Sequence, residues 1–145
     1  MSYKRTTYTY KISEILSDDI KLSNTVRQMF SSPDFAEEIG ISHITPTAYR
    51  RIHEHLTAVL DRAIEVLSEP KPEKISEVVV GLTKGLILVE YQLARRQISK
   101  ELGDKLKEVL TSLLDSLKES DAVKKFERAR TLLDALAVLV YRRSR

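Results

Sequence analysis

Residues 75–98, ISEVVVGLTKGLILVEYQLARRQI, carry the pattern that decides the fold. Apolar residues recur here at intervals of four and three, which draws one stripe along an α-helix: Ile75, Val79, Leu82, Leu86, Val89 and Leu93. A second stripe, formed by Val80, Ile87, Tyr91, Ala94 and Ile98, extends the apolar surface around most of the helix. Because a helix that is apolar on nearly all sides is typically buried, we expect it inside a bundle, with other helices on more than one side.

Gly81 and Gly85 lie on one face of this predicted helix. A glycine in a helix costs about 1 kcal/mol relative to alanine, so a compensating contact is expected. We predict that a neighbouring helix passes close to the backbone here. The candidates are the helix that begins near Asp104 and the last helix of the chain.

Start and stop signals divide the rest of the chain into further helices. Ser32-Pro33 and Thr45-Pro46 each place proline at the first helical position, which indicates two helix starts. Gly40 is expected to end the first of these helices, and the prolines at 70 and 72 end the second at about residue 68.

Two more boundaries are expected in the C-terminal half. Gly103-Asp104 is interpreted as a C-cap followed by an N-cap, with a helix running straight through Gly103 as the alternative. Ser120-Asp121 is expected to cap the last helix.

The N-terminal region is expected to add only small elements. Residues 12–16 and 22–30 are predicted to form short helices, and residues 1–11 an extended or mobile arm. No stretch has a convincing β-strand pattern. We therefore predict one all-α domain over residues 1–145, a bundle of four long helices preceded by one to three short ones.

Composition excludes several classes of protein. The chain has 145 residues, of which 42% are hydrophobic and 31% charged, as in globular domains rather than disordered or fibrous chains. It lacks cysteine, a membrane-spanning apolar run and a signal-peptide core, so a cytoplasmic protein without membrane contact is expected. One Asn and three Gln among 45 charged residues (24 + 21) suggest a thermophilic source.

Residues for catalysis or metal binding were sought and not found. His53 and His55 point about 200° apart on a helix, and His43 lies before it, so these histidines do not form a metal site. There is neither a nucleophile-elbow motif nor a glycine-rich phosphate loop. Glu90 is the one carboxylate near the apolar stripes, and Lys84 or an arginine of a neighbouring helix is its expected partner. We predict no enzyme activity and no cofactor.

Basic residues are the remaining candidate functional groups. Residues 1–69 carry 8 Lys+Arg and 10 Asp+Glu, a net charge of −2, whereas residues 70–145 carry 16 and 11, a net charge of +5. Candidate nucleic-acid contacts, grouped by predicted helix, are Arg50 and Arg51; Arg95, Arg96 and Lys100; and Lys124, Lys125 and Arg128. Such rows suit sequence-independent contacts with phosphates. The alternative is that they are ordinary surface cations paired with Glu.

The C-terminal two thirds resembles a known family. An apolar helix ends in Tyr91-Gln92-Leu93-Ala94-Arg95-Arg96, a leucine-rich helix follows, and a last helix opens with Phe126-Glu127-Arg128 and closes with Tyr141-Arg142-Arg143. This order resembles the small helical subunits of CRISPR effector complexes, above all the Csm-type small subunit of type III systems. Residues 1–44 lie outside the resemblance.

The resemblance implies a subunit without catalytic activity. Several copies would stack into a short filament beside the guide-bearing backbone of the complex, and basic helix faces would contact CRISPR RNA and target nucleic acid. Expected partners are therefore other copies and other effector-complex subunits. Two other classes of protein stay open: a helical DNA-binding or chromatin protein that reads duplex DNA through the helix carrying Arg50 and Arg51, and a helical adaptor that binds only proteins.

Overall fold

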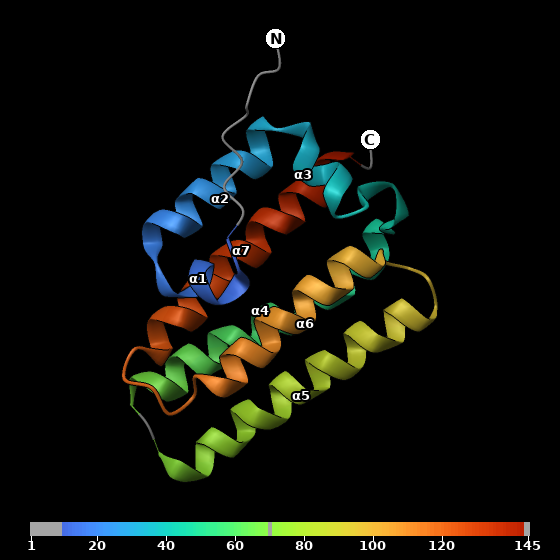
Figure 1. Cartoon of the computed structure of the whole chain (residues 1–145). Helices are drawn as coiled ribbons and strands as arrows, with labels where there is room; N and C mark the ends of the chain where they lie inside the picture. The colour runs from blue at the N-terminus through green and yellow to red at the C-terminus, as the bar shows by residue number, and fades with distance from the viewer. Residues whose placement is uncertain (1–9, 70, 144–145) are drawn as a thin grey trace.

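All regular structure in residues 10–69 and 71–143, which the computed structural model describes, is helical (Figure 1). The elements are α1 (Ile12–Ser17), α2 (Asp19–Ser31), α3 (Pro33–Glu38), the 3-10 turn η1 (Ile41–His43), α4 (Pro46–Ser68), α5 (Pro72–Ala94), α6 (Lys100–Asp115) and α7 (Ala122–Arg143). The all-α class is therefore confirmed for this part of the chain. The predicted arm falls mostly on residues 1–9, outside the described residues.

Local capping explains most helix boundaries. The Asp18 carboxylate accepts the Ile20 N–H at 2.8 Å to start α2, and the Ser32 hydroxyl accepts the Asp34 N–H at 3.3 Å to start α3. Gly40 follows α3 in the left-handed region, with φ of +65°. The predicted starts at residues 33 and 46 and the predicted stop before residue 70 are confirmed.

The boundary between α5 and α6 differs from the expected one. The interpretation of Gly103 as a cap is wrong, because α6 runs from Lys100 through Gly103 to Asp115. The alternative, a helix that continues through Gly103, is the one that the structure shows. α5 instead ends at Ala94 in a Schellman motif, in which Gln97 N–H donates to Gln92 O at 2.9 Å and Arg96 N–H to Leu93 O at 3.0 Å. The apolar pattern continues to Ile98, but this residue belongs to the turn, so the pattern alone predicted too long a helix.

The centre of the molecule is the antiparallel pair α4 and α7. Tyr49 Oη donates to Leu133 O at 3.1 Å, and Arg130 Nε donates to Asp61 Oδ1 at 3.0 Å, so a later residue of α4 meets an earlier residue of α7. α1 and α2 cover another side of α7, and their Ile15, Leu16, Leu22 and Met29 are buried in the same core. The expected bundle of four long helices is not confirmed as the whole core, because the short helices complete it.

α5 lies at the edge of the molecule and packs mainly against α4 and α6 (Figure 1). Its buried positions are Val78, Leu82, Gly85, Val89 and Gln92. Two helices pack on it, but the expectation that it lies inside the bundle is wrong, since Val80, Ile87 and Tyr91 expose 51, 64 and 53% of their surface. One apolar stripe of this helix is covered, and the other faces outward.

Close approach at the two central glycines is confirmed, although the predicted neighbour is wrong for Gly81. A Cβ on Gly81 would lie 3.0 Å from Val59 Cγ1 of α4. A Cβ on Gly85 would lie 2.6 Å from Leu56 Cδ2 of α4 and 3.4 Å from Leu110 Cδ1 of α6. α4, which was not among the candidates, is thus the main partner of this glycine face.

Candidate nucleic-acid interface

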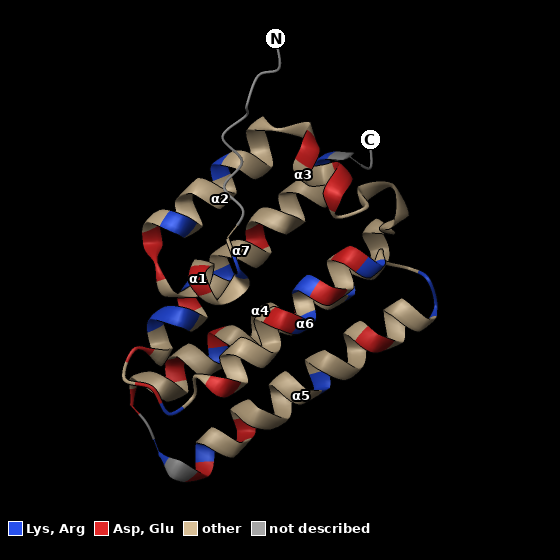
Figure 2. Ribbon diagram, viewed as in Figure 1, with Lys and Arg blue, Asp and Glu red and all other residues tan. Residues whose placement is uncertain are grey.

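The eight predicted cations fall at two opposite ends of the molecule. Thr45 N–H donates to Gln97 O at 2.8 Å, which places the start of α4 beside the α5–α6 turn. The Asp61–Arg130 pair places the other half of α4 beside the start of α7. Because α4 has 23 residues, about 35 Å separates its two ends. The two groups of cations therefore do not converge. Basic and acidic residues, blue and red in Figure 2, are interspersed along most helices.

In the first part of α7, two of the three predicted cations form ion pairs within the protein. Arg128 Nε donates to Asp19 Oδ1 at 2.7 Å and its Nη1 to Leu16 O at 3.0 Å, and only 12% of its side chain is exposed. This guanidinium holds the pKa of Asp19 below its usual value. Lys125 pairs with Glu119 and is 15% exposed, which leaves Lys124 as the exposed cation of this group.

The other five predicted cations form what we call the end cluster: Arg50, Arg51, Arg95, Arg96 and Lys100. All five are exposed, and none makes an ion pair with another residue of the described part of the chain. They come from the start of α4, the end of α5 and the start of α6. In contrast, the cations Lys21, Arg62, Lys107, Lys125, Arg128 and Arg130 are each held by a carboxylate.

A firmly anchored turn carries the middle of the end cluster. The buried Ser99 hydroxyl accepts the Leu102 N–H at 3.1 Å as the N-cap of α6 and donates to the Ile39 carbonyl, which ties the turn to the end of α3. Arg96 adopts φ of +56°, so its side chain is presented from a strained backbone position. The backbone positions of Arg96 and Lys100, on either side of Ser99, are therefore set before any ligand binds.

Tyr91 adds an aromatic ring that the sequence pattern did not reveal as functional. The Arg95 guanidinium lies 5.4 Å from the centre of the Tyr91 ring, and its Nη1 donates to Tyr91 Oη at 3.3 Å. An exposed ring beside a cation is the arrangement on which nucleic-acid bases stack. The apolar pattern predicts Tyr91 to be buried with the second stripe. Its four-residue spacing from Arg95 is the local signal that identifies Tyr91 and Arg95 as neighbours on the helix surface.

Acidic residues limit the basic character on one side of the end cluster. An open hollow between the α5–α6 turn and α6 is lined by Arg96 and Lys100, but also by Glu101 and Asp104. Lys107 in the same hollow donates to Glu90 Oε1 at 2.7 Å, so the predicted partners of Glu90 were wrong. A polyanion would therefore contact the outer side of the cluster rather than this hollow.

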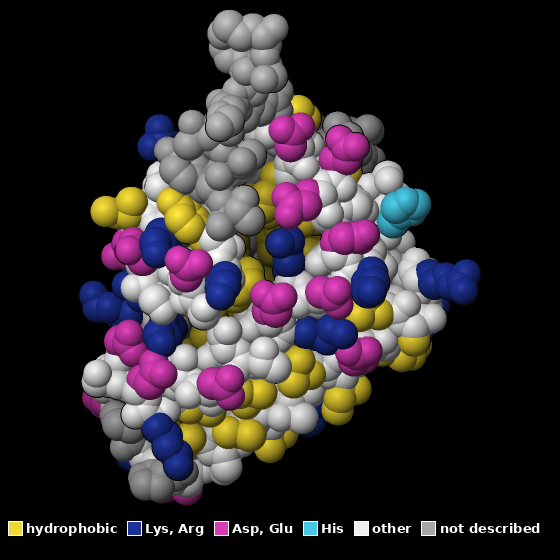
Figure 3. All heavy atoms as spheres, viewed as in Figure 1, with side chains coloured by type: hydrophobic (Ala, Val, Ile, Leu, Met, Phe, Trp, Pro, Cys, Tyr) yellow, Lys and Arg dark blue, Asp and Glu magenta, His cyan; other side chains and the backbone are white. Residues whose placement is uncertain are grey.

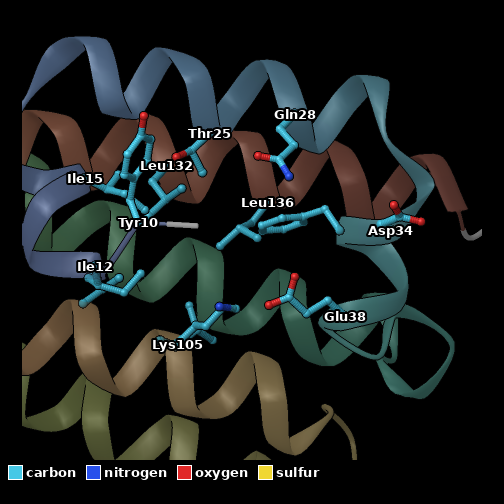
Figure 4. A pocket seen from close by; sticks show the side chains of 13 residues that line it. Tyr10, Ile12, Ile15, Thr25, Gln28, Asp34, Glu38, Lys105, Leu132 and Leu136 are labelled. Atoms are coloured by element: carbon cyan, nitrogen blue, oxygen red, sulfur yellow. The ribbon is translucent and has the colours of Figure 1, made fainter. Parts of the chain in front are cut away.

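Two other places lack the features of a site. A pocket between α1, α2, α3, α6 and α7 is lined by apolar side chains such as Leu132 and Leu136 and by polar ones such as Glu38 and Lys105, and its volume is ≈ 90 Å³ (Figure 4). This volume is well below the roughly 300–1,000 Å³ of typical small-molecule sites. The described residues contain no cluster of His, Asp and Glu suited to a metal ion, since His53 contacts Asp134 at 3.0 Å and His55 contacts Gly81 O at 3.4 Å.

Comparisons with protein-family models, with curated proteins and with solved structures found no match to this chain. In the described residues, no helix is both long enough and apolar enough to cross a bilayer.

Proposed function

We propose that this protein is a non-catalytic small subunit of an RNA-guided CRISPR interference complex, which contacts the backbone of guide or target nucleic acid through the end cluster. The observation that carries the nucleic-acid part is the set of five exposed cations, without carboxylate partners among the described residues, at one end of the molecule. The assignment to a CRISPR complex, its filament and its other subunits rests on the family resemblance.

The chemistry of the end cluster favours phosphate over other anions of the cell. Arginine forms bidentate hydrogen bonds with phosphate oxygens, and four of the five cations are arginines. Tyr91 beside Arg95 suits stacking with an unpaired base, which favours a single strand over a duplex. Lys125 and Arg128 are left out of the proposed interface because carboxylates within the fold already hold them.

A charge-matched pair of variants tests this proposal. The first variant combines Arg51→Gln, Arg95→Gln and Lys100→Gln in the end cluster. The control combines Lys11→Gln, Lys71→Gln and Lys118→Gln, which removes the same charge from exposed positions elsewhere. Binding of a mixed-sequence single-stranded RNA is measured over a range of salt concentrations, and circular dichroism checks that both variants fold.

We expect the end-cluster variant to bind RNA more weakly and with a flatter salt dependence, whereas the control stays close to wild type. Each phosphate contact adds about 0.7 to the slope for a single strand, so three lost contacts reduce it by about 2. The measurement is repeated in the reconstituted complex, because one copy covers few phosphates. Equal behaviour of the two variants at both levels would reject the proposed interface. A preference of the wild type for duplex DNA would favour the DNA-binding alternative. Absence of RNA binding by the wild type would favour the alternative that the protein is an adaptor that binds only proteins.

A further inference from the structure

The outer face of α5 is an exposed apolar stripe, of which the proposed RNA contacts use only Tyr91 and, at its end, Arg95. Val80 and Ile87 lie at its centre, and hydrophobic side chains form a band over α5 along the lower edge of the molecule (Figure 3). Val79 and Tyr91, 37 and 53% exposed, widen the stripe. So many large apolar side chains on one helix face are typical of an interaction surface rather than of ordinary exposed residues.

The spacing of the stripe favours a helix as the group that covers it. Val80, Ile87 and Ala94 are seven residues apart, and Ser76, Thr83 and Glu90 fill the intermediate positions of a four-and-three pattern. All six are exposed in α5, and Lys107 pairs with the Glu90 carboxylate. This is the seam spacing of two helices packed side by side.

Charges along one edge of the stripe indicate which helix fits. This edge carries Glu77 in the first half of α5, Lys84 in the middle and Arg95 at its end. In a parallel pair this edge would face the other edge of the second copy, whereas in an antiparallel pair it meets the same edge and sets Glu77 against Arg95 twice. Arg95 has no carboxylate partner among the described residues, and Glu77, which Arg62 contacts at 3.2 Å, is 51% exposed.

We propose that two copies of this protein associate through antiparallel packing of their α5 outer faces. Pairing Glu77 with Arg95 puts the two-fold axis near residue 86. Val80 then lies against the ring of Tyr91 of the second copy, and Ile87 against the aliphatic part of Lys84. This closed, two-fold contact differs from stacking in a filament. It forms without nucleic acid, and it competes with the proposed RNA contact for Tyr91 and Arg95.

The size of the face predicts a weak dimer. A helix of 23 residues is about 35 Å long and 10 Å wide, so each copy buries on the order of 350 Å². A standard stable interface buries about 800 Å² per partner. We therefore expect monomers in dilute solution and dimers at protein concentrations on the order of 100 µM.

Sedimentation equilibrium without RNA tests the surface. Ile87→Glu should weaken dimerisation at least about tenfold, because a carboxylate would be buried in the contact. Ile20→Glu is the matched control, since Ile20 on α2 is 72% exposed and lies away from α5; it should dimerise like wild type. A monomeric wild type at millimolar concentration, or an equal effect of the two variants, would overturn the proposal.

A charge-swap experiment tests the antiparallel arrangement. Glu77→Arg alone and Arg95→Glu alone should each dimerise poorly, because each places like charges together twice. Mixing the two variants should restore dimerisation as a heterodimer, in which both pairs are again of opposite sign. Failure of the mixture to associate better than either variant would overturn this arrangement. RNA binding is absent from both experiments, so their outcome is independent of the proposed function.

Discussion

Arg96 is the residue whose conformation is hardest to explain by stability alone. It occupies the left-handed region at the C′ position of α5, where glycine is preferred. A side chain with a Cβ costs about 1 kcal/mol there. Strain of this kind is found where a side chain is needed for function, and the proposed phosphate contact supplies such a need.

Arg96→Gly should therefore raise the free energy of unfolding by about 1 kcal/mol while weakening RNA binding. Arg96→Ala is the control, because it removes the same charge but keeps the Cβ in the strained region. Urea unfolding and RNA titration of both variants separate the two effects. A glycine variant no more stable than the alanine variant would show that the backbone strain is negligible.

Tyr49 links stability to pH. Its hydroxyl donates to Leu133 O, its ring is fully buried, and burial raises its pKa above the usual value near 10. The Tyr49 hydroxyl therefore loses its proton at a lower pH in the unfolded chain than in the native protein. The contribution of Tyr49 is thus fully present below about pH 10 and is lost as the pH rises further.

Tyr49→Phe should lower the free energy of unfolding by about 0.5–1.5 kcal/mol at neutral pH, through the lost hydrogen bond. It should also reduce the loss of stability above pH 10. Urea unfolding across this pH range measures both effects, with Tyr91→Phe as the exposed control. Identical alkaline slopes for wild type and Tyr49→Phe would contradict the assigned role.

At the scale of elements, the contact that sets the angle between α5 and α6 is Leu93 on Gly103. A Cβ on Gly103 would lie 2.5–2.8 Å from the Cδ2, Cδ1 and Cγ atoms of Leu93. The whole end of that side chain, not one flexible atom, would have to move. α6 thus depends on a glycine in its first turns even though glycine weakens a helix.

Gly103→Ala should accordingly destabilise the protein by about 1–3 kcal/mol through overpacking, although alanine is the better helix former. In a Leu93→Ala background the same change should become neutral or stabilising by up to about 1 kcal/mol. Thermal or urea unfolding of the four proteins of this double-mutant cycle gives the coupling. Equal effects of Gly103→Ala in both backgrounds would disprove the steric explanation.

At the scale of the whole molecule, Arg128 joins the N-terminal helices to α7. Its contacts to Asp19 and Leu16 O are the described polar links between the α1–α2 corner and α7. The buried Ile15, Leu16 and Leu22 supply the apolar part of the same junction. Loss of the arginine would leave the Leu16 carbonyl without its donor.

Arg128→Gln should lower the free energy of unfolding by about 1–3 kcal/mol and increase hydrogen exchange in α1 and α2 more than in α6. Arg62→Gln is the matched control, because its pairs with Glu65 and Glu77 are exposed to solvent and contribute little to stability. A uniform rise of exchange over the whole chain would argue against a local role.

The sequence by itself determined the helical class, because the four-and-three apolar spacing and the proline starts at residues 33 and 46 act on neighbouring residues. It also indicated that the glycines at 81 and 85 admit a close neighbour. It left open which element that neighbour is, and it put the end of α5 too late, because Ile98 continues the pattern in the turn.

Only the tertiary structure decided which apolar stripe of α5 is covered and which cations are available. Periodicity shows that Val80 and Ile87 lie on a common face, but contact with α4 and α6 determines that this face is outside. Likewise, Arg128 and Arg95 look equivalent in sequence. Arg128 forms an ion pair with Asp19, which lies 109 residues earlier in the chain, whereas no described carboxylate pairs with Arg95. Burial and pairing depend on residues far apart in the chain, so local patterns do not specify them.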